Sequence, residues 1–205
     1  DGAGAWGQVA ILSASNGEVG DDFGLSVAIA GDVIVVGADC ERGASNEYTC
    51  SGAAYVLHRN QGGADAWGEV ALLRGSDTGD VDQFGWDVAI DGDTLVVGSI
   101  NAGVGGAAYV FQRNQGGADA WGEVAILQSS EAQIGDAFGD CLDISGDTIV
   151  VGAHYEDGGP GEPNSAAGAA YVFQRNLGGA DSWNQVTILR ASDPQAGDQF
   201  GVALA

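Results

Sequence analysis

The sequence contains no lysine and no methionine, and only three prolines and three cysteines among its 205 residues. Its six basic side chains are all arginines, against 29 aspartates and glutamates, so the formal net charge is −23 at pH 7. Such a surface repels phosphate backbones and anionic lipids, which argues against nucleic-acid binding and peripheral membrane docking. It remains compatible with cationic partners, divalent metals and high salt. No apolar run approaches the roughly 18 residues of a membrane-spanning helix, so we expect no membrane insertion.

Glycine is abundant instead, with 36 residues, and it punctuates an internal repeat. One pattern begins at Phe23 (FGLSVAIAGDVIVVGAD), at Phe84 (FGWDVAIDGDTLVVGSI) and at Phe138 (FGDCLDISGDTIVVGAH), and Phe200 begins a fourth copy. A second pattern, GAAYV, follows each of the first three and leads through an Arg-Asn pair to a Trp. Such self-similarity is typical of architectures in which each unit stacks on the next.

The spacing inside the repeat is constant except at one place. Each Trp precedes its Phe-Gly by 17 residues, each Phe precedes the Gly of VVG by 14, and each Tyr of GAAY precedes the next Trp by 12. Only the stretch from the Gly of VVG to the Gly of GAAY changes, with 15, 8 and 16 residues in the three copies. One loop therefore varies on a constant framework.

Each copy predicts four short strands. In the first copy, residues 26–29 alternate with the period of a pleated strand, and a Gly-Asp pair makes a tight hairpin turn into the apolar run 33–37. GAAYVLHR (52–59) and WGEVALL (67–73) supply the third and fourth strands. No segment longer than about ten residues shows helical periodicity. We therefore predict an all-β fold.

Four strands in one copy cannot bury both of their faces, so the copies are predicted to be β-propeller blades of four antiparallel strands. Within a single segment, 1–205, three full blades are expected at about 23–73, 84–127 and 138–189. Partial units at 1–15 and 198–205 are each expected to hold one strand. The repeated aromatic residues are predicted to fill the core between blades: Phe23, Phe84, Phe138, Trp67, Trp121 and Trp183.

The repeat resembles the FG-GAP repeat, the blade unit of integrin α-subunit propellers and of many bacterial extracellular proteins. Phe-Gly is present in all four copies, and the GAP half is present as Gly37-Ala38, Gly98-Ser99 and Gly152-Ala153. The place of the Pro is taken by Asp39, Ile100 and His154. The resemblance implies a β-propeller that binds other proteins or glycans outside the cell.

Integrin-like propellers often hold Ca²⁺ in an Asp-rich loop between the first two strands of a blade. A hard cation needs about six to eight oxygens, and here that loop is only a Gly-Asp turn, so the integrin site is not transferred. Asp77, Asp80 and Asp82 are weak alternative ligands, and otherwise no cofactor is expected. Aspartates two residues before each Phe are interpreted as caps of the turn into the first strand, with Ca²⁺ binding as the alternative. They are Asp21, Asp82, Asp136 and Asp198.

The cysteines point to an oxidising environment. Cys40 and Cys50 lie in the same variable loop, and a disulfide between them would contribute roughly 2.5 to 3 kcal/mol by constraining the unfolded chain. This pairing favours an extracellular or cell-surface location; two reduced thiols or a metal site are the alternatives. Cys141 stands where the other copies have Ser26 and Asp87. It is predicted to be a free thiol, buried or facing the propeller channel, with pairing to another chain as the alternative.

Catalysis finds little support in the sequence. It has no Gly-rich phosphate loop after a parallel strand, no HExxH and no nucleophile within a recognisable motif. His58 lies at the end of a third strand, where the other copies have Gln112 and Gln174, and is predicted to lie at the surface. We therefore expect a non-enzymatic module for adhesion or assembly.

The variable loops 38–51, 99–105 and 153–167 are the predicted binding surface, because there a rigid scaffold presents unlike loops. The ligand is expected to be a protein, a glycan or further copies of the chain. Two other functions stay open: a structural subunit of a surface polymer joined through propeller edges, and a regulatory propeller attached to an enzyme. The candidate contacts are Asp39, Glu41, Arg42, Asn46, Tyr48, Ile100, Asn101, His154, Tyr155, Glu156 and Asp157.

Three blades do not close a ring, since propellers generally need about four to eight. The strand expected from Trp6 to Ser13 has no third strand to pair with, and the strand expected from Phe200 has no second strand. We expect either a longer chain of about seven repeats or copies that complete one another's blades head to tail.

Overall fold

The structure is a computed structural model that describes residues 7–42, 50–158 and 165–205. In these ranges all regular secondary structure is β, arranged as three sheets of four antiparallel strands. None of the described residues forms a helix long and apolar enough to cross a membrane. The predicted all-β class is confirmed.

Each sheet takes its strands in chain order, as the repeat predicts, and we call the sheets blades 1 to 3. A two-residue Gly-Asp turn joins the first and second strands; in blade 1 Ala30 pairs with Val33 across Gly31, whose φ is +57°. Blade 1 contains β1 (Val27–Ala30), β2 (Val33–Ala38), β3 (Ala53–Arg59) and β4 (Trp67–Leu73). Blade 2 contains β5 (Phe84–Asp91), β6 (Thr94–Ser99), β7 (Ala107–Arg113) and β8 (Trp121–Leu127). Blade 3 contains β9 (Leu142–Ser145), β10 (Thr148–Ala153), β11 (Ala169–Arg175) and β12 (Trp183–Leu189).

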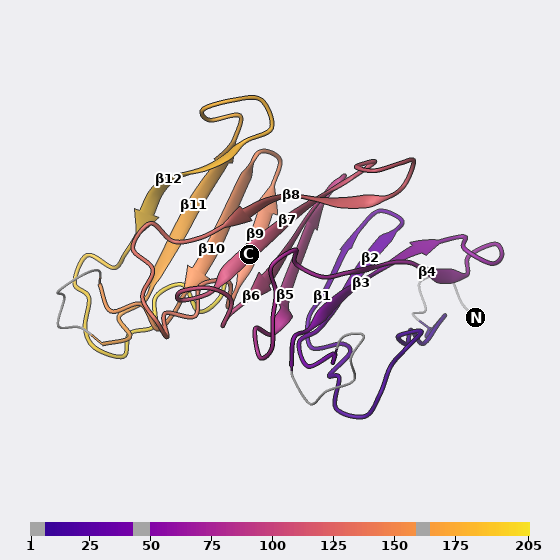
Figure 1. Cartoon of the computed structure of the whole chain (residues 1–205), viewed down its shortest axis with the longest axis horizontal. Helices are drawn as coiled ribbons and strands as arrows, with labels where there is room; N and C mark the ends of the chain where they lie inside the picture. Colours follow the sequence, from indigo (N-terminus) through magenta and orange to yellow (C-terminus); the bar gives the residue numbers. More distant parts are fainter. Residues whose placement is uncertain (1–6, 43–49, 159–164) are drawn as a thin grey trace.

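The blades stack face to face in chain order and fan out (Figure 1). β5 lies against β1 and β2, and β9 lies against β5 and β6. Apolar side chains fill both junctions, with Phe84 buried in the first and Phe138 in the second. Each of these rings contacts the Tyr ring of its own blade edge to face. The ring centroids are 5.2 Å apart for Phe84 and Tyr109 and 5.3 Å apart for Phe138 and Tyr171. The three sheets are thus propeller blades in an open array.

The two halves of the sequence repeat meet across each junction. Gly52 forms a parallel bridge with Phe84, and the same bridge recurs at the next two Phe-Gly pairs. In β2, Gly37 lies so close to the Gly85 carbonyl that a Cβ at position 37 would be 2.0 Å from that oxygen. The glycines of VVG and Phe-Gly therefore allow the backbones of successive blades to touch.

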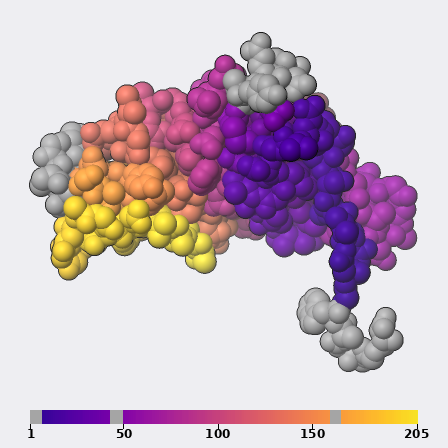
Figure 2. Space-filling view, turned by 90° about the horizontal axis from the view of Figure 1, so that it is seen from below, coloured from indigo at the N-terminus to yellow at the C-terminus, as the bar shows by residue number. Residues whose placement is uncertain are grey.

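The single strands predicted at the two ends are absent from the described residues, and this part of the prediction is wrong. Residues 7–14 have no strand structure, and residues 201–205 form none either. Leu12 and Ala14 pack against the apolar cluster of blade 1, and the chain before them leads away from it (indigo in Figure 2). Only the bridge between Gly168 and Phe200 remains of the last strand. A strand needs a neighbour to pair its backbone N–H and C=O groups, and the 205 residues contain neither of the two neighbours required. Trp6 lies outside the described residues.

Candidate functional site

The antiparallel strand order gives every blade two different ends. The turns between the first and second strands and between the third and fourth strands lie at one end, which we call the turn face. The described parts of the variable loops 38–51, 99–105 and 153–167 lie at the other end, which we call the loop face. The first is repetitive in sequence, and the second differs from blade to blade.

The predicted contacts on the loop face divide into exposed and buried side chains. Asn101 and Tyr155 are exposed, and Asn46 and Tyr48 lie outside the described residues. Partly exposed contacts are Arg42, Ile100, His154 and Asp157. Buried contacts are Asp39, Glu41 and Glu156. Because these three carboxylates are buried, a partner as large as a protein or a glycan reaches them only if the loops rearrange.

Glu41 and Glu156 brace their loops through ion pairs. The Glu41 carboxylate lies 2.6 Å from the Arg74 guanidinium, and the Glu156 carboxylate lies 3.0 Å from that of Arg190. Both arginines directly follow the fourth strand of their blade, so each pair ties a variable loop to the sheet. A carboxylate buried without such a partner would be strongly destabilising, which explains why acid and base occur together.

Blade 2 has neither member of this pair. The corresponding residues are Ala102 and Gln128, and its variable loop is the short one. The ion pair therefore accompanies the two long loops and is dispensable where the loop is short.

The predicted disulfide between Cys40 and Cys50 is confirmed, and it closes the variable loop of blade 1. Cys141 is a buried free thiol, as expected, and donates a hydrogen bond to the Gly201 carbonyl at 2.7 Å. Burial, together with the nearby charges of Asp140 and Asp87, raises its pKa to about 12. Because the thiolate is the reactive form, this thiol is a poor nucleophile near neutral pH.

The aspartates before each Phe act as caps, which confirms the main interpretation. Each accepts a hydrogen bond from the backbone N–H three residues earlier, at 2.7 Å from Glu18 to Asp21 and 2.6 Å from Gly79 to Asp82. The same bond recurs at Asp136 and Asp198.

The weak calcium candidates do not assemble into a site. Asp82 is a cap, Asp77 accepts a hydrogen bond from the Tyr109 hydroxyl at 2.7 Å, and Asp80 is exposed. Among the described residues, these three carboxylates do not gather at metal-ligand distances. Asp22 and Asp39 do approach each other, beside Cys40, with ligand atoms within 4.8 Å of one another. Nothing in the repeat pattern singles out that pair.

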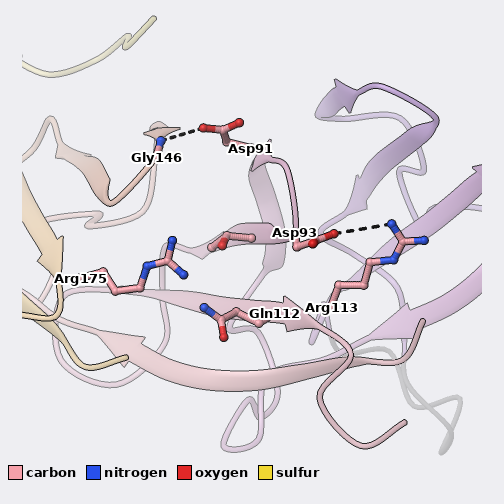
Figure 3. A pocket seen from close by; sticks show the side chains of 7 residues that line it. Asp91, Asp93, Gln112, Arg113, Gly146 and Arg175 are labelled. Carbon is pink, nitrogen blue, oxygen red and sulfur yellow. Dashed lines mark hydrogen bonds and ion pairs between the residues drawn. The ribbon is translucent and has the colours of Figure 1, made fainter. Parts of the chain in front are cut away.

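The turn face has a groove at each blade junction. The groove between blades 1 and 2 has a volume of about 550 Å³, and the groove between blades 2 and 3 about 370 Å³. In the second, Arg113 and Arg175 come from adjacent blades, and the Asp91 carboxylate accepts a hydrogen bond from the Gly146 N–H at 2.7 Å (Figure 3). Asp93 pairs with Arg113 at 3.6 Å. The arginines that line these grooves are thus paired with turn aspartates.

His58 lines the first groove but is only 7% exposed, so its predicted surface position is wrong. It pairs with Val33 inside the sheet, and the turn face of blade 2 covers it. Burial and the nearby Arg113 guanidinium lower its pKa. Position at the end of a strand did not reveal this burial, because blade 2 provides the cover.

A sequence model of the FG-GAP repeat matches residues 6–57, 67–111 and 121–173. The chain belongs to the FG-GAP repeat family. The second and third matched segments begin at the first residue of β4 and β8 and end within β7 and β11. Each of these two units therefore begins with the last strand of one blade and continues with the first three strands of the next. Across a junction, the VVG glycine of one unit meets the Phe-Gly glycine of the following unit. The sequence matches no curated protein.

Proposed function

We propose that this FG-GAP chain is a non-enzymatic extracellular module that binds a protein or a glycan through its loop face. The observation that carries the proposal is the contrast between a constant three-blade framework and three unlike loops on one face. Binding residues concentrate on loops that a rigid scaffold positions.

The bracing of the long loops supports a binding role. The disulfide closes the blade 1 loop, and the Glu41–Arg74 and Glu156–Arg190 pairs anchor two loops to their sheets. A loop held in place before binding loses less conformational entropy when the ligand arrives. The disulfide also supports an extracellular location, because such bonds persist in oxidising compartments.

The test exchanges the blade 1 loop for the blade 2 loop. Residues 38–51 are replaced by the sequence of 99–105, together with Arg74→Gln, so that no arginine loses its partner. Blade 2 shows that the shorter loop and Gln128 suit this framework. The matched control is Gln61→Ala, an exposed change on the turn face.

Binding is measured on an array of glycans and purified surface proteins, and folding by circular dichroism. The wild type is expected to bind a defined subset, the loop exchange to lose it while staying folded, and Gln61→Ala to keep it. Binding that survives the exchange, or a wild type that binds nothing, would contradict the proposal.

Exposed apolar side chains on the outer blade faces favour a second function, a structural subunit assembled through those faces. Val27 and Ile29 of β1 are 61% and 64% exposed, whereas Val88, the counterpart of Val27 in blade 2, is 5% exposed. Phe200, beside blade 3, is 37% exposed. Apolar groups exposed together favour association. Concentration-dependent oligomers in light scattering that Ile29→Ser abolishes would support assembly, and a monomer at micromolar concentration would oppose it.

A further inference from the structure

Two carboxylates of blade 1 meet on the loop face. Asp22 directly precedes the Phe-Gly pair, and Asp39 directly follows β2. One carboxylate oxygen of each lies within 4.8 Å of the other and of the Cys40 sulfur. That sulfur belongs to the disulfide and has no thiolate to offer. The ligand atoms available at this place are therefore oxygens.

Asp39 carries an acceptor that the protein leaves unused. Its side chain is buried, with 4% of the residue exposed. Oδ2 accepts a hydrogen bond from the Gln83 amide at 3.0 Å, while Oδ1 is buried without a hydrogen-bond partner. Buried polar atoms normally have partners, so an unpaired carboxylate oxygen calls for one. Burial raises the pKa of Asp39, and the charge of Asp22 raises it further.

The other blades act as an internal control for these positions. The residue before Phe has the same left-handed backbone in each blade, with φ of 57°, 58° and 58°. Carboxylates occupy both positions only in blade 1, so the fold itself requires neither of them. The counterparts are Gln83 and Ile100 in blade 2, and Ala137 and His154 in blade 3.

We propose that Asp22 and Asp39 form a binding site for a hard divalent cation, Ca²⁺, on the loop face of blade 1. Oxygen ligands select hard cations over thiophilic ones. A cation held between the two carboxylates would relieve their repulsion and give the buried Asp39 side chain a partner of opposite charge. With two protein carboxylates the affinity falls at the weak end of calcium sites, about 10⁻⁴ to 10⁻³ M. The site does not depend on which ligand the loop face binds.

The experiment is calcium titration of the whole chain by isothermal calorimetry, with thermal unfolding in EDTA and in 10 mM CaCl₂, at ~0.1 M salt to screen diffuse charge. The variants are Asp39→Asn and Asp22→Asn. Asp80→Asn is the control, because it removes the same charge from an exposed aspartate outside the pair. We expect Ca²⁺ to raise the Tm of the wild type and the control alike. Both site variants are expected to weaken binding by tenfold or more and to lose the Tm response.

If Asp39 only stabilised the fold, Asp39→Asn would lower the Tm in EDTA. The proposal expects the opposite: in EDTA the variant unfolds at or above the wild-type temperature, because the amide removes a buried charge and keeps an acceptor for Gln83. Asp22 is exposed, so Asp22→Asn still tests the site if the first variant misfolds. The proposal is overturned if calcium leaves the wild type unchanged, if the site variants respond like the wild type, or if Asp80→Asn loses as much binding as they do.

Discussion

Gly85→Ala tests whether the backbone contact between blades holds the array together. Gly85 is the second residue of β5 and belongs to the Phe-Gly pair of blade 2, and its φ is +95°. A Cβ there would lie 2.3 Å from the Ala53 oxygen and 3.0 Å from the Ala38 nitrogen, both backbone atoms of blade 1. Neither atom can yield as a flexible side chain would, so the methyl group must push the two blades apart.

The expected loss has two parts. Holding a non-glycine residue at this φ costs about 1–3 kcal/mol, and forcing a methyl into a close-packed contact costs about 1–3 kcal/mol more. We expect Gly85→Ala to lower the free energy of unfolding by about 2–6 kcal/mol. That is a large share of the roughly 5–15 kcal/mol of a typical domain.

Two further glycines separate the parts. Gly92, in the turn of blade 2, has φ +56° and open space around the position of a Cβ, so Gly92→Ala measures backbone strain alone, about 1 kcal/mol. Gly98 has no positive φ, but its Cβ would lie 2.0 Å from the Gly139 oxygen, so Gly98→Ala measures the contact alone, about 2–3 kcal/mol. The assay is equilibrium urea unfolding followed by tryptophan fluorescence. If Gly85→Ala costs no more than Gly92→Ala, close contact between blades does not stabilise the array and the reasoning fails.

Three other predictions use the same unfolding assay. Asp82→Ala removes a cap and should lower the free energy of unfolding by about 1 kcal/mol. Asp80 is exposed, so Asp80→Ala should change that free energy little. Equal losses of stability in the two variants would oppose the capping role. Arg190→Gln leaves the fully buried Glu156 carboxylate without its cation and should lower the free energy of unfolding by about 2–3 kcal/mol, most of which a second change, Glu156→Gln, recovers; simple additivity of the two losses would contradict the pairing. Burial lowers the pKa of His58 in the folded protein. As the pH falls below about 6.5, the unfolded chain therefore binds more protons than the folded chain does, and the free energy of unfolding decreases. His58→Gln should therefore lose less stability than the wild type between pH 7.5 and 5, and equal losses would count against this role.

Local sequence was sufficient for the blades because their signals are local. The alternation before Gly31, the Gly-Asp turn and the apolar run after it predict β1 and β2 within one residue at each end. The caps were predictable for the same reason, since Asp82 binds a backbone N–H three residues away. The disulfide followed from two cysteines in one short loop.

Long-range contacts decided what the loop residues do. Glu41 looks like a solvated loop acid, but its partner Arg74 lies 33 residues further along the chain. The repeat itself indicates this pair, because blade 2 has Ala102 in place of Glu41 and Gln128 in place of Arg74. No comparable signal marked His58, because packing against the next blade is what buries it.

The sequence by itself therefore determined the strand order, the turn chemistry and the glycines at each blade junction, because hydrogen bonding and backbone sterics over a few residues specify them. Only the tertiary structure decided which polar side chains are buried and which meet. Asp22 and Asp39 come together because β1 and β2 pair antiparallel, which brings the segment before β1 beside the end of β2. The strands expected at the two ends fail to form for a related reason: alternation makes a strand possible, but a paired neighbour makes it stable.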